Sequence, residues 1–481
     1  MTPFDLADFP ALSNGEKISV VRKKELENRF TMGAEFYQPY FIGRVEKIKQ
    51  KGKFQSLGNL CNLITDGDHS STQYTNDGVL YLLSESVKEG YLDTNVRRYI
   101  SSELHNSLRR SKLKPRNVVL TKTGAYFGKS AVIPNDFPEA NTSAHVGKFV
   151  VIEEIINPYY LSTFFNCDYG YSQLRRRGMK ASRPEIKLVE FEDITIFLPY
   201  HSFQEKIEQH VQFSINKLTQ SEEIFSQAEN TLLYELSFAN WKPKHEQIFI
   251  KHYSHAKQSS RIDAEYYQPK YEEIIQAIQG YSNSWDRLEK LAFVEKCVEV
   301  GSNEYLEKGI PFVRVSNLSP FEITEEKYIS DELYEELIHH QPRKGEILLS
   351  KDATPGIAYY LKEEPKKMIP SGGILRLKLK SDKINHECLT LILNSILTKE
   401  QINRDVGGSV ILHWRPDQVK ETAIPILPQE KQIQIQKKVT ESFNLRKQSK
   451  HLLECAKRAV EIAIEQDEET ALRWLEKESR L

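Results

Sequence analysis

The feature that most constrains the fold of this 481-residue chain is an internal duplication. The stretch MGAEFYQPYF at residues 32–41 returns as IDAEYYQPKY at 262–271, which is 230 residues later. YISSEL at 99–104 returns as YISDEL at 328–333, at an offset of 229. Matches that keep one order and nearly one offset are not explained by coincidence among common residues. A period this long indicates a repeated whole domain rather than a solenoid repeat.

Three further pairs of segments continue the same order. KPRNVVLTK, ending at Lys122, parallels PRKGEILLSK, ending at Lys351. We align Arg183-Pro184-Glu185-Ile186-Lys187 with RPDQVK at residues 415–420. Leu-Pro followed shortly by QEK occurs after residue 197 and again after residue 426. We therefore expect two copies of one mixed domain, each ending in a strand that is closed by Leu-Pro and followed by a long helix.

Both long helices have apolar residues at heptad spacing. The seam comprises Val211, Leu218, Phe225 and Leu232 in the first helix and Val439, Leu453 and Val460 in the second, where Arg446 interrupts it. Small residues between them, namely Ala228, Ala456 and Ala463, allow close approach. The pattern predicts an antiparallel coiled coil that holds the two domains apart. The alternative is that each helix is amphipathic and lies on its own domain.

The predicted fold class is α+β, with two pseudo-repeated mixed α/β domains separated by the paired helices. The expected boundaries are an N-terminal extension and short helix at 1–50, domain 1 at 51–200, helix 1 at 201–240, a connector with the second AEYYQP element at 241–285, domain 2 at 286–428 and helix 2 at 429–481.

Composition excludes several classes of protein. Hydrophobic residues at 39% and charged residues at 28% are typical of a globular chain, and the net charge of −1 gives no global sign of nucleic-acid binding. The five cysteines form no CxxC pair, which argues against a disulfide framework or a zinc site and favours a reducing cytoplasm. The N-terminus MTPFDLADFP lacks a signal peptide, and no apolar run of about 18 residues predicts a membrane span.

Three fragments imitate active sites. Asn157-Pro158-Tyr159-Tyr160 resembles the NPPY motif of amino-methyltransferases, but Asn at an N-cap followed by Pro is also a common helix start, which we favour. Glu185 and Lys187 form the tail of a nuclease metal motif, yet the second copy has different spacing, so we interpret them as structural. His69 lies near two aspartates, where a polar loop is favoured over a metal site. We expect no catalytic, cofactor or metal site in this chain.

Local basic charge indicates where DNA would bind. Residues 104–135 and 169–184 contain no acidic residue and many lysines and arginines. In the first copy the loop TKTGAYFGK at 121–129 combines two glycines with basic, hydroxyl and aromatic side chains, which suit phosphate and base contacts. The predicted DNA contacts of the first copy are Lys122, Thr123, Tyr126, Lys129, Arg175, Arg176, Arg177, Lys180 and Arg183. A solvated helix face remains the alternative for these basic runs.

The second copy has counterparts that differ in residue content. SKDATPG at 350–356 occupies the place of the first loop, and GGSVILHWR at 407–415 the place of the segment around Arg183. The predicted contacts there are Lys351, Thr354, Ser409, His413 and Arg415, whereas Trp414 is expected in the core. A shared scaffold with divergent loops is what two domains that recognise different DNA sequences would have.

These loops, the GGS…W segment and the two Leu-Pro-to-QEK entries resemble the specificity (S) subunits of type I restriction–modification enzymes, over most of the chain. The resemblance implies two target-recognition domains, each recognising one half of a bipartite site in double-stranded DNA. It also implies that the helices dock two adenine methyltransferase subunits, which bind S-adenosylmethionine, and that motor–nuclease subunits join them. The N-terminal extension and the AEYYQP elements also resemble specificity regions of related methylation-based phage-defence systems.

Two other classes of function stay open at this point. A stand-alone DNA methyltransferase or nuclease would turn over DNA without partners. A coiled-coil scaffold that binds only protein would lack the salt-dependent DNA affinity that several phosphate contacts produce.

Overall fold

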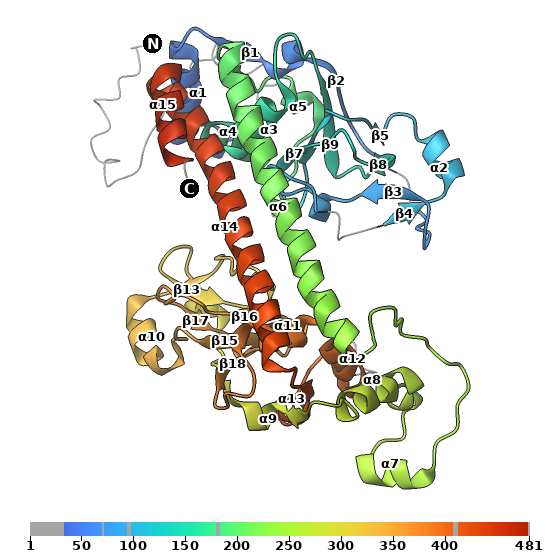
Figure 1. Cartoon of the computed structure of the whole chain (residues 1–481). Coiled ribbons are helices and arrows are strands. Elements are labelled where there is room, and N and C mark those ends of the chain that lie inside the picture. The colour runs from blue at the N-terminus through green and yellow to red at the C-terminus, as the bar shows by residue number, and fades with distance from the viewer. Residues whose placement is uncertain (1–32, 70–71, 94–97, 179–182, 407–411, 480–481) are drawn as a thin grey trace. The chain divides into compact units, whose positions relative to one another are not determined.

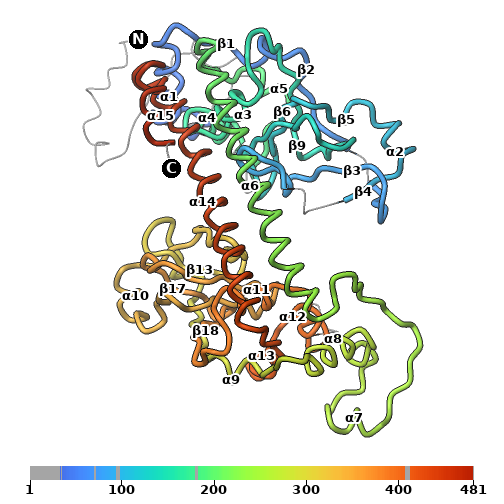
Figure 2. The backbone as a smooth tube through the Cα atoms, in the orientation of Figure 1, coloured from blue at the N-terminus to red at the C-terminus, as the bar shows by residue number. Residues whose placement is uncertain are grey.

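The structure is a computed structural model that describes residues 33–69, 72–93, 98–178, 183–406 and 412–479. The chain forms two compact units (Figure 1). Unit 1 combines residues up to Leu218 with Arg446–Leu481, and unit 2 comprises Thr219–Leu445. Unit 1 thus contains both the beginning and the end of the described chain, and Figure 2 shows α15 (Glu468–Glu478) close to α1 (Pro39–Gln50). An ion pair of 2.9 Å joins Lys53, which follows α1, to Glu468 of α15.

Unit 1 is built on a four-stranded antiparallel sheet in the order β2-β9-β6-β7. Its strands are β2 (Cys61–Asp66), β9 (Val146–Val151), β6 (Val118–Thr121) and β7 (Ser130–Val132). β6 is buried on both faces, because Val118 and Leu120 pack with α3 (Pro158–Asn166) and α4 (Asp168–Gly178), while Val119 faces a second, smaller core. Burial on both sides explains why β6 is a continuous apolar run instead of an alternating one.

A second sheet of unit 1 has the order β4-β3-β8-β5, in which β3 and β8 are parallel. Its strands are β4 (Tyr99–Ile100), β3 (Val79–Leu82), β8 (Ala140–Thr142) and β5 (Lys112–Leu113). The short strands β1 (Phe54–Ser56) and β10 (Thr195–Phe197) pair separately. The short helices α2 (Ser102–Ser107) and α5 (Leu188–Phe191) complete this copy.

Unit 2 repeats this topology. Its main sheet has the order β12-β18-β15-β16, formed by β12 (Ala292–Lys296), β18 (Ile374–Leu379), β15 (Glu346–Ser350) and β16 (Ala358–Tyr360). The second sheet, β14-β13-β17, comprises β14 (Tyr328–Ile329), β13 (Ile310–Val313) and β17 (Ile369–Pro370), and β13 and β17 are again parallel. β11 (Trp285–Arg287) pairs with β19 (Ala423–Pro425), as β1 does with β10. The duplication inferred from the sequence is confirmed in the order of these strands, except that β5 has no counterpart among the described strands of unit 2.

The helices of unit 2 are α7 (Tyr253–Ser259), α8 (Pro269–Gln279), α9 (Leu288–Leu291), α10 (Asp331–Glu336), α11 (His386–Asn394), α12 (Ile396–Val406) and α13 (Pro416–Glu421). α8 and α10 to α13 follow the order of α1 to α5, whereas α7 and α9 have no α-helical counterpart among the described residues of the first copy. Each AEYYQP-type element is a 3-10 turn, Ala34–Tyr37 or Ala264–Tyr267, whose proline then begins α1 or α8. Pro is suited to this place because the first helical residue needs no N–H partner.

Buried and half-buried amide side chains hold the same backbone groups in both copies. The side-chain amide of Asn166 donates to the Ser130 carbonyl in β7 at 2.8 Å and accepts from the Ser130 N–H at 3.0 Å. Asn394 bonds the two backbone groups of Ala358 in β16 at the same distances. Gln173 bonds both backbone groups of Thr195, as Gln401 does for Ala423. Such side chains satisfy strand edges that would otherwise be buried without partners. The two copies therefore share these side-chain hydrogen bonds as well as their strand topology.

The long helices are α6 (His201–Glu235) and α14 (Gln429–Glu465), and they pack together within each unit. In unit 1, Ser214 Oγ donates to the Ser449 carbonyl at 2.8 Å; in unit 2, Ser221 Oγ donates to the Ser442 carbonyl at 2.9 Å. A step of seven residues forward along α6 matches a step of seven back along α14, so the pairing is antiparallel, as predicted. The predicted seam residues Val211, Leu232, Val439 and Val460 are buried. The domain boundaries expected from the sequence stay a prediction.

Candidate nucleic-acid interface

One corner of each copy gathers four separate chain segments around a lysine. Lys122 follows the end of β6, where its N–H donates to the His145 carbonyl at 2.9 Å and its carbonyl accepts from Ile186 N at 3.0 Å. Lys351 follows β15 in the same way, bonded to the Gly373 carbonyl at 2.9 Å and to Trp414 N at 2.8 Å. The backbone hydrogen bonds of the two corners are therefore equivalent, whereas the side chains around them differ.

These bonds correct one alignment made from the sequence. Ile186 and Trp414 occupy the same place, so Arg415 corresponds to Lys187 and not to Arg183. Lys187 and Arg415 each precede a short helix, α5 or α13, and each backbone N–H is bonded at 3.0 Å to the side chain three residues later. The two Arg-Pro pairs are not at equivalent positions, because the equivalent residues of this segment are those that cap α5 and α13.

The corner of the first copy is organised by the carboxylate of Asp66. Asp66 is the last residue of β2 and is buried, and its oxygens lie 3.0 Å from His69 Nε2, 3.1 Å from Arg110 Nη2 and 3.4 Å from Lys122 Nζ. Lys122 is buried as well, whereas His69 and Arg110 are exposed. The predicted contact Lys122 therefore supports the corner from within. Thr123 is also buried and forms an antiparallel bridge with Glu185.

In the loop that follows Lys122, the side chains of Tyr126 and Lys129 are half-buried. The Tyr126 ring lies between two lysines, with Lys88 Nζ 5.3 Å and Lys129 Nζ 5.9 Å from its centroid. Gly128 has a φ of 86°, and a side chain there would collide with the ring of Tyr171. This glycine thus makes room for a neighbouring ring of the protein itself and not, as expected, for a ligand. Arg183 is exposed beside Gly124 at the other side of the loop.

A buried lysine connects this corner to the basic segment that precedes it. Lys148 in β9 donates from Nζ to the carbonyls of Arg110 and Lys112, both at 2.8 Å. Burial lowers the pKa of the Lys148 ammonium, with Lys114 and Arg110 adding repulsion. The counterpart Arg376 in β18 lies 3.8 Å from Glu346 and also bonds Glu295. A cation therefore occupies the same interior place of both copies, but backbone carbonyls hold it in the first copy and glutamates contact it in the second.

The predicted arginines of α4 do not share one surface. Arg175 is exposed, but Arg176 stacks 3.8 Å from the centroid of the Phe36 ring and donates to the Phe36 carbonyl. Arg177 is buried and donates to the carbonyls of Gln173 and Asp193. Contact of Arg176 and Arg177 with DNA does not fit their burial; they fasten the AEFY turn and the approach to β10. Lys180 lies outside the described residues.

The corner of the second copy has a different set of side chains. Lys351 Nζ lies 2.6 Å from Asp352, the next residue, and Asp352 also contacts Nδ1 of the exposed His413. Thr354 is exposed, and Arg415 is exposed and paired with Asp417 at 3.2 Å. Trp414 is fully buried, as predicted. Ser409 lies outside the described residues.

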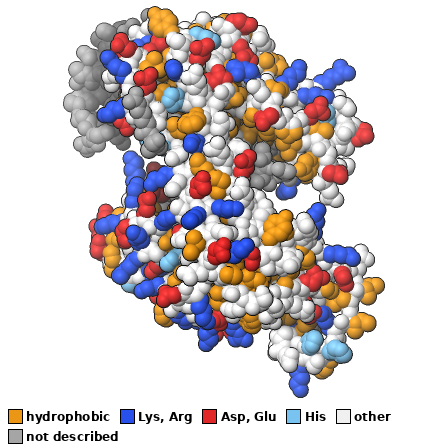
Figure 3. Space-filling view, viewed as in Figure 1, with side chains coloured by type: hydrophobic (Ala, Val, Ile, Leu, Met, Phe, Trp, Pro, Cys, Tyr) orange, Lys and Arg blue, Asp and Glu red, His pale blue; other side chains and the backbone are white. Residues whose placement is uncertain are grey.

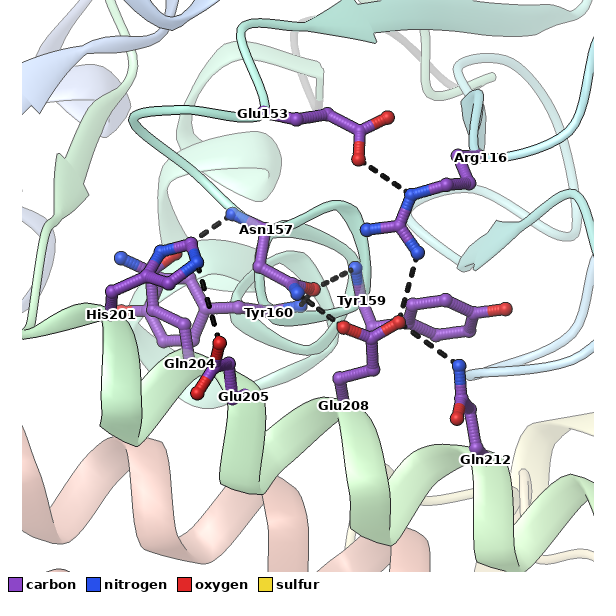
Figure 4. Close-up of polar contacts among 10 residues, drawn as sticks. All are labelled: Arg116, Glu153, Asn157, Tyr159, Tyr160, His201, Gln204, Glu205, Glu208 and Gln212. Atoms are coloured by element: carbon purple, nitrogen blue, oxygen red, sulfur yellow. Dashed lines mark hydrogen bonds and ion pairs between the residues drawn. The ribbon is translucent and has the colours of Figure 1, made fainter.

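The fragments that imitate active sites have structural roles. Asn157 Oδ1 accepts from Tyr159 N at 2.9 Å and Tyr160 N at 3.2 Å, which caps α3 as predicted, and Figure 4 shows it held against Gln204 and Glu208 of α6. Asn385 caps α11 in the same way at Cys388 N. Glu185 and Lys187 form the bridge and the helix cap described above.

No group of three or more His, Cys, Asp or Glu side chains that could hold a metal ion occurs among the described residues. Within the same residues, no helix is long and apolar enough to cross a membrane. On the face drawn in Figure 3, basic and acidic side chains are interspersed.

Comparison with known proteins identifies the second copy. Residues 292–454 match the family described as type I restriction modification DNA specificity domain. No curated protein matches the chain. Among solved structures, an S subunit of a type I restriction–modification system from M. genitalium aligns with 11% identity, over 88% of this chain and 95% of that one, at a TM-score of 0.35.

The HsdS subunit from Thermoanaerobacter tengcongensis aligns with 15% identity, over 89% of this chain and 96% of that one, at a TM-score of 0.25. At such TM-scores these two likenesses carry no argument, and the assignment rests on the family match and on the internal repeat. Residues 292–454 are therefore similar to the type I restriction modification DNA specificity domain, and the match covers most of the second copy and part of α14.

Proposed function

We propose that this chain is the DNA-recognition subunit of a type I-like restriction–modification complex, in which each of the two copies recognises one half of a bipartite site in double-stranded DNA. The observation that carries the proposal is the match of residues 292–454 to a DNA specificity domain. The first copy has the same strand order and the same bonding at its corner, so the same role follows for it.

The side chains of the two corners that are exposed or half-buried, together with exposed Arg175 of α4, are the proposed DNA contacts. They are Tyr126, Lys129, Arg175 and Arg183 in the first copy and Thr354, His413 and Arg415 in the second. Arg, Lys and His donate to phosphates and to guanine, whereas the hydroxyls of Tyr and Thr bond to phosphates and sugars. Because the two sets differ, the two half-sites differ in sequence.

The chain itself is proposed to break no bond. Methylation of adenine would belong to two partner methyltransferase subunits, which bind S-adenosylmethionine and dock on α6 and α14, and motor–nuclease subunits would join them. All five cysteines are free thiols, which is typical of proteins of a reducing compartment and supports a cytoplasmic location.

The test is methylome sequencing of cells with and without the gene. Loss of one bipartite methylated motif upon deletion is expected, and an unchanged set of methylated adenines would refute the proposal. Purified chain incubated with DNA, Mg²⁺ and S-adenosylmethionine should show no turnover. Its DNA affinity should fall steeply with salt, because several phosphate contacts release counterions.

A further inference from the structure

The two corners share an arrangement that neither sequence motif nor repeat alignment reveals. In each copy an aspartate holds the ammonium of the shared lysine and also contacts one exposed histidine. In the first copy Asp66 lies 3.4 Å from Lys122 Nζ and 3.0 Å from His69 Nε2. In the second, Asp352 lies 2.6 Å from Lys351 Nζ and contacts His413 Nδ1.

The aspartates come from different positions of the repeated frame. Asp66 ends β2, and the residue that ends the equivalent strand β12 is Lys296. Asp352 forms an antiparallel bridge with His413, and the equivalent bridge of the first copy joins Thr123 and Glu185. The lysine–aspartate–histidine arrangement is therefore formed twice, by different elements around the same lysine.

The histidines are likewise at different positions, and each has a glutamate as its counterpart. His69 stands three residues after the end of β2, where the second copy has Glu299 three residues after the end of β12. Parallel bridges from Asp68 to Ser143 and from Val298 to Ser371 fix this register. His413 stands where the first copy has Glu185. Histidine and glutamate are thus exchanged between the two positions.

We propose that His69 and His413 are the equivalent specificity-determining residues of the two domains, each contacting a base edge of its own half-site, and that Asp66 and Asp352 are positioning residues that orient them. This inference rests on the proposed function. His69 and His413 would thus have the same role, although they do not occupy equivalent positions of the repeat.

The chemistry of the four side chains fits contact with base edges. An imidazole that is bonded to a carboxylate through one ring nitrogen presents the other, and the side chains of His69 and His413 are 59% and 63% exposed. Glutamate accepts from the exocyclic amino groups of cytosine and adenine, and Glu185 and Glu299 are exposed. Near the shared lysine, the position of histidine in one copy is that of glutamate in the other. The same backbone arrangement therefore presents different hydrogen-bonding groups in the two copies.

A contribution to folding stability does not explain why an aspartate–histidine pair occurs in both copies. An ion pair with an exposed histidine contributes little to folding. The buried lysine needs the aspartate, yet it has no need of the histidine. The repeated presence of the histidine is better explained by contact with a ligand.

The test uses the native complex in cells and reads out the methylated motif. H69A should relax discrimination at one base pair of one half-site by about tenfold or more, and H413A should do so in the other half only. The control is H245A, because the side chain of His245 is also exposed, with Nε2 3.2 Å from Glu265, but belongs to the connector before the second AEYYQP element. H245A should leave the motif unchanged.

Three results would overturn the inference. The first is an unchanged motif in H69A and H413A, and the second is the same change in both halves. If H69A loses methylation at every site, as misfolding would produce, H69Q must retain a motif altered in one half; the third overturning result is loss at every site in H69Q as well. D66N should alter the same half as H69A. A motif that does not depend on the gene at all would instead refute the proposed function.

Discussion

Replacement of Asp66 by Asn tests how the first corner is held together. The carboxylate lies 3.4 Å from the ammonium of Lys122, and the side chains of these two residues are 3% and 7% exposed. Removing one partner of a buried pair costs about 3 to 5 kcal/mol, because the other charge stays buried without compensation. Arg110 and His69 are exposed partners and add less than about 1 kcal/mol each. We expect D66N to destabilise unit 1 by about 3 kcal/mol.

The second copy supplies a matched control. Asp352 is 24% exposed, so water can solvate Lys351 when the carboxylate is lost. D352N should therefore cost about 1 kcal/mol. Hydrogen exchange gives both values, since amides of β6 and β9 report on unit 1 and those of β15 and β18 on unit 2. The double variant D66N/K122M should be more stable than D66N because the unpaired ammonium is gone. Equal effects of D66N and D352N, or no recovery in the double variant, would refute this reasoning.

Three further predictions concern the frame. S221A removes a buried hydroxyl that donates to the Ser442 carbonyl, so it should lower the free energy of unfolding of unit 2 by about 1 kcal/mol, measurable by urea denaturation. N157A removes the cap of α3 and should cost about 1 to 2 kcal/mol while leaving the recognised motif unchanged in a methylome, an outcome a base-gripping role would not give. Burial, with Arg183 and Lys122, lowers the pKa of His145 below its ordinary 6.5, so the unfolded chain binds that proton more readily. Stability should therefore fall as the pH drops through 6.5, and H145Q should weaken this dependence in unfolding curves recorded at pH 5.5 and 7.5.

The sequence predicts the frame well because the frame is repeated. Matches such as YISSEL and YISDEL mark a strand and a serine-capped helix in both copies, since Ser101 and Ser330 cap α2 and α10. The heptad seam predicts the pairing of α6 and α14. The serines of that seam were missed, although Ser214 and Ser221 are seven residues apart and return as Ser442 and Ser449.

The corners are less predictable because their partners are distant in sequence. Nothing near Lys122 shows that Asp66, from another strand, neutralises it. Arg176 and Arg177 continue the basic run of Arg175, but one helical turn buries two of the three against Phe36 and Asp193. The exchange of histidine and glutamate was hidden because aligning the Arg-Pro pairs shifted this segment by four residues. A repeat alignment fixed on the residues that start α5 and α13 would have shown it.

The most direct test of the central claim, that each copy recognises its own half-site, is a pair of methylomes. One strain has Y126A in the loop of the first copy, and the other has T354A in the equivalent loop of the second. The account predicts that each variant alters the methylated motif in a different half and leaves the other half intact. Alteration of the same half by both variants, or of both halves by either, would contradict it.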